Sequence, residues 1–284
     1  MIWGSTWIAI KVSIGETPFI MAASRFFIAG ATLVIYQVIR KRPIFPRRED
    51  QRIIITLGLG NFFFGYGLTY WGIQFVNSNV TSILWATLPV MIAIFAHRML
   101  DNEKLSLSST FSLIGSIIGT LLIFDIQGAT FDPEAAMGMT VILVSILAAA
   151  YPNVLYKREG HHLDPVSTNA SAMLIGGVLL FLTGFILEPW STMHLSMTTI
   201  GATLYLAIIG SAIGFTLYFW LLKHITIVKM SYTTFLIPII ASFWGWLLLG
   251  EELSGTGLWG AIIIILSVSL PELVRTLKFN SKVE

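Results

Sequence analysis

The sequence predicts an all-α integral membrane protein with ten transmembrane helices, arranged as two inverted five-helix repeats. Three observations predict it: an unusually apolar composition, a succession of long apolar runs, and a phrase that occurs twice. Of the 284 residues, 55% are hydrophobic and 11% are charged, whereas ordinary soluble domains carry about 25% charged residues. One soluble core could not bury this much apolar surface, so the surrounding solvent must be lipid.

The apolar runs have the length that a membrane helix needs. The hydrocarbon core of a bilayer is about 30 Å thick, which takes roughly 20 apolar residues. Continuous runs favour helices over the alternating strands of a barrel. A further run at 1–14 spans only about 21 Å at 1.5 Å per residue, so we expect the first helix to be shortened at its N-terminus. Nine runs reach the required length, at 17–39, 53–76, 78–97, 105–124, 135–156, 165–187, 197–222, 230–250 and 253–271.

The basic residues predict the orientation, because Lys and Arg concentrate in cytoplasmic loops. The segment RKRPIFPRREDQR at 40–52 carries six of them. With ten helices, the loops at 98–104, 157–164 and 223–229 and the C-terminal tail fall on the same side. These segments hold 15 of the 17 basic residues. We therefore expect a multi-pass protein of the cell membrane with both termini in the cytoplasm.

One phrase occurs twice. TLPVMIAIFAHRMLDNEKLS at 87–106 and LIPIIASFWGWLLLGEELS at 236–254 both run from a proline to a glutamate. Pro89 and Pro238 are 149 positions apart, as are Glu103 and Glu252. Each half holds five helices, an odd number, so the second half must cross the membrane in the opposite sense. The sequence thus predicts repeats at 1–128 and 129–284, an inverted duplication that secondary transporters use for alternating access.

These residues also resemble a known family. The opening WGSTWIAIK, the segment AASRFFIAGA and the twice-used proline-to-glutamate ending are similar to the drug/metabolite transporter superfamily, in its EamA-type permease branch. The resemblance implies that helices 1, 3, 4, 6, 8 and 9 surround a central cavity, and that small metabolites, often amino acids, are moved outward. The sequence departs from the family pattern at its short first helix and at Asp101-Asn102-Glu103, where Gly-Glu is usual.

Charge and residue content exclude several kinds of site. The net charge is +2, the basic residues lie in loops rather than along a stripe, and there is no cysteine, so nucleic-acid and thiolate-metal sites are not expected. The five histidines lack metal-ligand spacing, and no cofactor is expected. All 15 acidic residues fall in loops or at helix ends, so the predicted cavity is uncharged. The expected partners are a small-molecule solute and the lipid bilayer; a homodimer is possible but not required.

Polar and aromatic side chains on the predicted cavity helices are the candidates for solute binding. Tyr66, Tyr70 and Gln74 follow one another at intervals of four, which places them on one helix face. As a set, the candidates suit a neutral, zwitterionic or aromatic solute, although aromatic residues in membrane proteins more often serve packing or the interface. The candidates are Trp3, Trp7, Tyr66, Tyr70, Gln74, Trp85, Tyr151, Asn153, Tyr218 and Tyr232.

Five further residues are gating or structural candidates. Arg25 could anchor a solute carboxylate; the favoured interpretation is a structural residue that pairs with helix ends or extends outward. Glu103 and Glu252 are interpreted as interfacial hinges or caps. Pro89 and Pro238 are expected in mid-helix, where a proline kinks the helix and frees a carbonyl. We also expect Lys11 to face the pathway or the outer surface.

Function follows from the repeat and the predicted cavity. The sequence predicts a secondary transporter that exports amino acids or related neutral or zwitterionic solutes. The alternatives are an integral-membrane enzyme and a structural or receptor-like membrane protein. The first alternative lacks a cluster of intramembrane Asp, His or Ser/Lys residues, and the second lacks a sizeable soluble domain.

The predicted orientation can be tested with a single cysteine, because the native chain has none. In intact cells, a cysteine placed at Arg47 should resist an impermeant thiol reagent and should react once the membrane is made permeable. Labelling of Arg47→Cys from outside intact cells would show that the orientation is the reverse of the predicted one.

Overall fold

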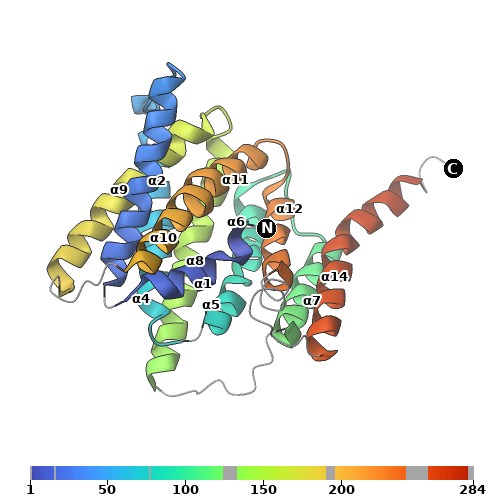
Figure 1. The fold of residues 1–284 in the computed structure, drawn as a ribbon. Coiled ribbons are helices and arrows are strands. Elements are labelled where there is room, and N and C mark those ends of the chain that lie inside the picture. Colours follow the sequence, from blue (N-terminus) through green and yellow to red (C-terminus); the bar gives the residue numbers. More distant parts are fainter. Residues whose placement is uncertain are drawn as a thin grey trace.

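The computed structural model describes residues 2–15, 17–76, 78–123, 133–189, 196–240 and 255–280. Within these residues the chain is helical and contains no strand (Figure 1). The elements in chain order are η1 (Ile2–Gly4), α1 (Thr6–Ser13), α2 (Pro18–Ile39), η2 (Arg48–Asp50), α3 (Gln51–Thr56), η3 (Leu57–Tyr66), α4 (Gly67–Gly72), α5 (Ser78–Trp85), α6 (Leu88–Met99), α7 (Leu107–Ile123), α8 (Pro133–Glu159), α9 (Pro165–Leu187), α10 (Met197–Tyr205), η5 (Leu206–Ile213), α11 (Gly214–Leu222), α12 (Ile227–Tyr232), η6 (Thr233–Phe235) and α14 (Gly255–Asn280).

Six helical segments among the described residues are long and apolar enough to cross a membrane. They are Pro18–Ile39, Arg48–Gly72, Val80–Met99, Pro133–Glu159, Pro165–Leu187 and Met197–Leu222. Shorter apolar helices cover Leu107–Ile123, Ile227–Ile240 and Gly255–Pro271. Large apolar side chains face outward, among them Phe185, Ile186 and Leu187 on α9. Such extended apolar surfaces are typical of proteins that contact a membrane or a partner.

The helix boundaries lie close to those predicted, with two differences. The last helix continues to Asn280 rather than ending at 271, so it is longer than its apolar run. The run predicted at 78–97 is divided at Ala86 and Thr87 into α5 and α6. The run predicted at 230–250 lies only partly within the described residues, which end at 240 in this region.

Two helix pairs pack closely through glycine. α2 lies along α9 at one side of the bundle, and α7 lies along α14 at the opposite side (Figure 1). A Cβ atom on Gly119 of α7 would lie 2.6 Å from the carbonyl oxygen of Gly260, and one on Gly260 would lie 2.5 Å from that of Gly119. Both distances are far below van der Waals contact, so the two backbones touch only because each position is glycine.

Two segments depart from α-helical geometry in the same way. η3 (Leu57–Tyr66) and η5 (Leu206–Ile213) are π-helical, each continuous with α-helix on both sides. π-helical turns are rare and occur frequently at functional sites. Their first residues, Leu57 and Leu206, are 149 positions apart, the offset that relates the two sequence phrases. Both segments pack against neighbouring helices near the centre of the bundle.

Gly119→Ala should destabilise the protein, because the added methyl group separates α7 from α14. Overpacking costs about 1–3 kcal/mol, which corresponds to roughly 2–5 °C for a chain of this size. Intrinsic tryptophan fluorescence during heating in detergent measures the shift. Gly201→Ala is the matched control, since its Cβ would meet no atom within 4 Å and alanine favours helix. Equal unfolding temperatures for both variants would contradict the close packing.

Candidate functional site

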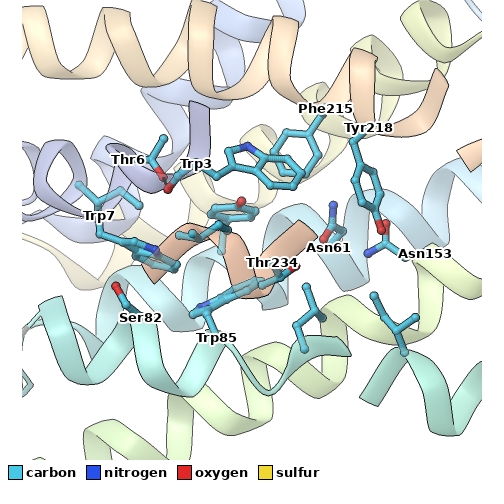
Figure 2. Close-up of a pocket in the computed structure, with 15 residues that line it drawn as sticks. Trp3, Thr6, Trp7, Asn61, Ser82, Trp85, Asn153, Phe215, Tyr218 and Thr234 are labelled. Carbon is cyan, nitrogen blue, oxygen red and sulfur yellow. Dashed lines mark hydrogen bonds between the residues drawn. The ribbon is translucent and has the colours of Figure 1, made fainter. Parts of the chain in front are cut away.

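A cavity lies between the helical segments at the centre of the bundle (Figure 2). The volume open to the centres of water molecules is about 60 Å³, enough for a few waters, since one water needs about 10–15 Å³ measured in this way. The cavity is therefore narrow. Its lining comprises Trp3, Thr6, Trp7, Ile10, Asn61, Tyr66, Ser82, Trp85, Leu88, Ile92, Asn153, Phe215, Tyr218, Thr234 and Ile237.

Aromatic rings in mutual contact form much of this wall. The ring centroids of Trp7 and Trp85 are 5.8 Å apart, and those of Trp85 and Tyr66 are also 5.8 Å apart. Tyr66 contacts Phe215, and Trp3 contacts both Phe215 and Tyr218 at 5.3–5.5 Å. Tilted and edge-on pairs at these distances are favourable beyond their buried area. The chain of rings gives the cavity a stiff apolar surface.

Backbone and side-chain hydrogen bonds hold two of these indoles in place. The Nε1–H group of Trp3 donates to the carbonyl oxygen of Gly210, 3.1 Å away in the π-helical segment η5. The Nε1–H group of Trp85 donates to the hydroxyl oxygen of Thr69 at 3.1 Å, and Thr69 also bonds Ser145. The two tryptophans are therefore oriented by three different helical segments, rather than by packing alone.

None of the described residues that line the cavity carries a charge. A charge does lie behind the wall: Arg25 of α2 is 1% exposed, and its guanidinium carbon is 4.8 Å from the ring centroid of Tyr66. Arg25 donates through Nε to the hydroxyl of Ser211 at 2.7 Å and through Nη1 to that of Tyr70 at 3.3 Å. Within the described chain no carboxylate lies at ion-pair distance from it.

The predicted candidates separate into two groups. Trp3, Trp7, Tyr66, Trp85, Asn153 and Tyr218 line the cavity; their contact with a solute stays a prediction. The other four lie elsewhere. Tyr70 is fully buried and accepts from Arg25, and Tyr151 is 37% exposed and packs on Phe95. Gln74 is exposed, and Tyr232 lies at a separate surface hollow beside Glu103.

The helix face expected for Tyr66, Tyr70 and Gln74 ends before Gln74. The spacing of four assumes an α-helix, but Tyr66 ends a π-helical segment and α4 ends at Gly72. Gln74 therefore lies in the turn beyond the helix, where its amide donates to the carbonyl oxygen of Trp71. The end of α4 removes Gln74 from the predicted face, whereas Tyr66 and Tyr70 both contact Arg25.

Pro89 and Arg25 differ from expectation. Pro89 lies in the first turn of α6. Pro238 lies within the helical stretch Ile227–Ile240, where the described residues of this region end, and a kink there stays a prediction. A proline in the first turn removes an N–H group that has no helical partner, so Pro89 marks the start of a helix rather than kinking one. Arg25 neither extends outward nor pairs with a helix end, because hydroxyl groups and a ring surround it.

The carboxylate of Glu103 accepts a hydrogen bond from a helix in the second half of the chain. Its carboxylate accepts the amide proton of Val228, 3.3 Å away at the start of α12. Burial raises the pKa of the Glu103 carboxyl, while this backbone bond and the charge of Lys157 oppose the rise. Glu103 thus accepts a backbone amide proton in the first turn of a helix that begins more than 120 residues later in the chain. Glu252 lies outside the described residues.

Several lining residues were missed in the sequence. Asn61 interrupts a run of apolar and aromatic residues, and that lone amide was the one available signal. The remaining missed residues have side chains of types found throughout the apolar runs, so nothing in the sequence set them apart. They are Thr6, Ile10, Ser82, Leu88, Ile92, Phe215, Thr234 and Ile237.

Comparisons with known proteins agree with this architecture. The model of the EamA-like transporter family matches residues 1–125 and 136–271. The uncharacterized transporter YoaV of Bacillus subtilis (strain 168) is 31% identical over 267 residues, which cover 93% of this chain and 90% of the relative. Protein PagO of Salmonella typhimurium is 26% identical over 283 residues, covering 99% and 92%.

A solved crystal structure shares the fold. It matches with a TM-score of 0.84 and 16% identity, covering 97% of this chain and 94% of the other. Since the family model spans most of the sequence and the relatives include named transporters, the protein is a multi-pass membrane transporter of small solutes rather than an enzyme. The chain belongs to the EamA-like transporter family.

Proposed function

We propose that this protein exports amino acids or related neutral or zwitterionic solutes across the cell membrane by alternating access. The observation that carries the proposal is the cavity, which is lined by aromatic rings and uncharged polar groups. A charged site would select ions of the opposite sign, whereas this lining suits a solute with little or no net charge. Rings also provide favourable faces for an ammonium group and for an apolar side chain.

We further propose ten transmembrane helices in two inverted repeats, divided near residues 128 and 129. The family model matches two consecutive segments of similar length, and the π-helical segments begin at positions 149 apart. Helices at the same position in the two proposed repeats also pack against each other. On α2 and α9, Gly30 lies against Leu174 while Gly177 lies against Phe27. The residue number along α2 falls as that along α9 rises, so these two helices run antiparallel, as an inverted repeat requires.

Two lysines make matching contacts in the two halves. The Nζ atom of Lys11 donates to the carbonyl oxygens of Ile73 and Val76, at 3.0 and 3.4 Å. The Nζ atom of Lys157 donates to those of Leu222 and Ile225, at 2.5 and 2.7 Å. The two pairs of acceptors are each 149 positions apart. Lys11 therefore serves the end of one helical segment as Lys157 serves the end of its counterpart.

The cavity also contains pairs of residues related by the same offset. Tyr66 and Phe215, Trp85 and Thr234, and Leu88 and Ile237 are each separated by 149 positions, and all six line it. A binding site between inverted repeats lies near the middle of the membrane. The paired lining supports a cavity situated where the two halves meet.

These contacts suggest how access could alternate. The basic-residue pattern predicts that Lys11 and the turn at 73–76 lie outside, and that Lys157 and the 223–229 loop lie inside. Each lysine holds the turn of one helical hairpin through hydrogen bonds. Both sets of bonds are present in this structure, in which the cavity is narrow. Release of one tip would open the cavity to one side only, because the other tip stays closed.

Solute flux tests the proposed function. Protein in liposomes should exchange radiolabelled neutral amino acids, and unlabelled neutral amino acids should compete where polyamines and sugar phosphates do not. Trp85→Ala should lower the flux at least tenfold, because a lining ring is lost. Tyr151→Ala is the control outside the cavity. No flux for any amino acid, or competition by sugar phosphates instead, would contradict the proposal.

The two lysines should bias access in opposite directions. A charge-assisted hydrogen bond is worth about 1.5–3 kcal/mol, so Lys11→Met should favour the outward-open state about tenfold or more. Lys157→Met should favour the inward-open state. Reaction of a cysteine at Ser82 with an impermeant reagent, added from each side, measures the bias. Lys223→Met is the control; shifts of both variants in one direction would refute alternating release.

A further inference from the structure

Two buried amides lie at the cavity with unused hydrogen-bonding atoms. The side-chain nitrogen of Asn61 and the side-chain oxygen of Asn153 have no partner among the described residues. Of the residues with such buried atoms, these two belong to the cavity lining. A buried polar atom without a partner costs about 1–3 kcal/mol, so native proteins rarely retain one without a reason.

The two amides come from helices that touch beside them. A Cβ atom on Gly60 would lie 2.9 Å from the Cγ atom of Pro152, and Asn61 and Asn153 are the next residues along η3 and α8. Figure 2 shows both side chains near Tyr218, at one end of the group of aromatic rings. The two amides therefore lie together at one end of the cavity.

The orientation of Asn153 is determined by its own helix. Its side-chain nitrogen donates to the carbonyl oxygen of Ala149 at 2.7 Å. That bond identifies which atom is the nitrogen and leaves the oxygen as a free acceptor. Asn153 can therefore receive a hydrogen bond from a positively charged or neutral donor at the cavity.

Asn61 presents an unused hydrogen-bond donor, whereas Asn153 presents an unused acceptor. Asn61 and Tyr66 lie five residues apart in η3, one turn of a π-helix, whose hydrogen bonds join residues five apart. The Arg25 guanidinium lies against the ring of Tyr66 from behind. Asn61 belongs to the same segment as Tyr66, and its side-chain nitrogen is a donor without a partner, which a carboxylate oxygen can satisfy.

We propose that Asn61 and Asn153 form the head-group subsite for an α-amino acid: Asn61 donates to the carboxylate, and Asn153 accepts from the ammonium group. The apolar side chain of the solute then lies toward Trp3, Trp7 and Trp85. This assignment rests on the proposed function and adds which part of the solute each end of the cavity binds.

Binding of three related probes to the purified full chain tests the assignment. The probes are L-phenylalanine, phenethylamine, which lacks the carboxylate, and 3-phenylpropanoate, which lacks the ammonium group. The native protein should bind L-phenylalanine about tenfold more tightly than either analogue, the change expected for one lost charge-assisted hydrogen bond. This comparison requires no variant, so it does not depend on whether any variant folds.

Two variants should then separate the roles. Asn61→Leu should weaken the binding of L-phenylalanine and of 3-phenylpropanoate about tenfold and leave the binding of phenethylamine unchanged. Asn153→Leu should weaken the binding of L-phenylalanine and of phenethylamine and leave that of 3-phenylpropanoate unchanged. Asn169→Leu is the matched control: Asn169 bonds the carbonyl oxygen four residues earlier, as Asn153 does, and its own oxygen is also unpaired, but it lies outside the cavity lining.

The outcomes distinguish this inference from the proposed function. If the native protein binds L-phenylalanine but its two analogues bind equally well, or both variants weaken all three probes alike, the head-group assignment is wrong and the proposed function stands. If the native protein transports no amino acid in liposomes, the proposed function is wrong and the assignment falls with it.

Discussion

Every backbone N–H and C=O group inside a membrane must find a partner within the protein, because lipid offers none. Regular helix meets this requirement along its length but leaves groups unpaired at each end. In this chain, charged side chains from distant helices satisfy several of those ends. Lys11 donates to the carbonyl oxygen of Ile73 just beyond the end of α4, and Glu188 accepts the amide protons of Phe19 and Ile20 at the start of α2. These bonds tie neighbouring helices together and set where each one stops.

The same requirement shapes the cavity. Where η5 leaves α-helical geometry, the carbonyl oxygen of Gly210 accepts the indole N–H of Trp3. Arg25 remains buried without a carboxylate among the described residues because two hydroxyls and the Tyr66 ring stabilise its charge. Keeping that charge behind the wall leaves the lining neutral. A neutral lining that still contains hydrogen-bonding groups can hold a polar solute and release it again, which a transporter must do.

Much of the fold could be predicted from composition and periodicity. Apolar runs such as 165–187 reappear as helices with nearly the same bounds, since length and hydrophobicity decide which segments enter a membrane. The family could be predicted as well, because its motifs occur twice at matched spacing. The aromatic character of the cavity was also predictable: Trp3, Trp85 and Tyr218 are large, amphipathic and located on helices that the resemblance placed at the centre.

By itself, then, the sequence determined the apolar helices, the two related halves and a set of aromatic candidates, because these depend on residue type and spacing along one chain. Only the tertiary structure decided which side chains meet. α4 ends at Gly72, which leaves Gln74 off the predicted face, and Lys11 donates to carbonyl oxygens more than sixty residues away. Asn61 and Asn153 became neighbours at the cavity because Gly60 lets two helices touch. Contacts between helices depend on the packing of all of them at once, and no local spacing encodes that.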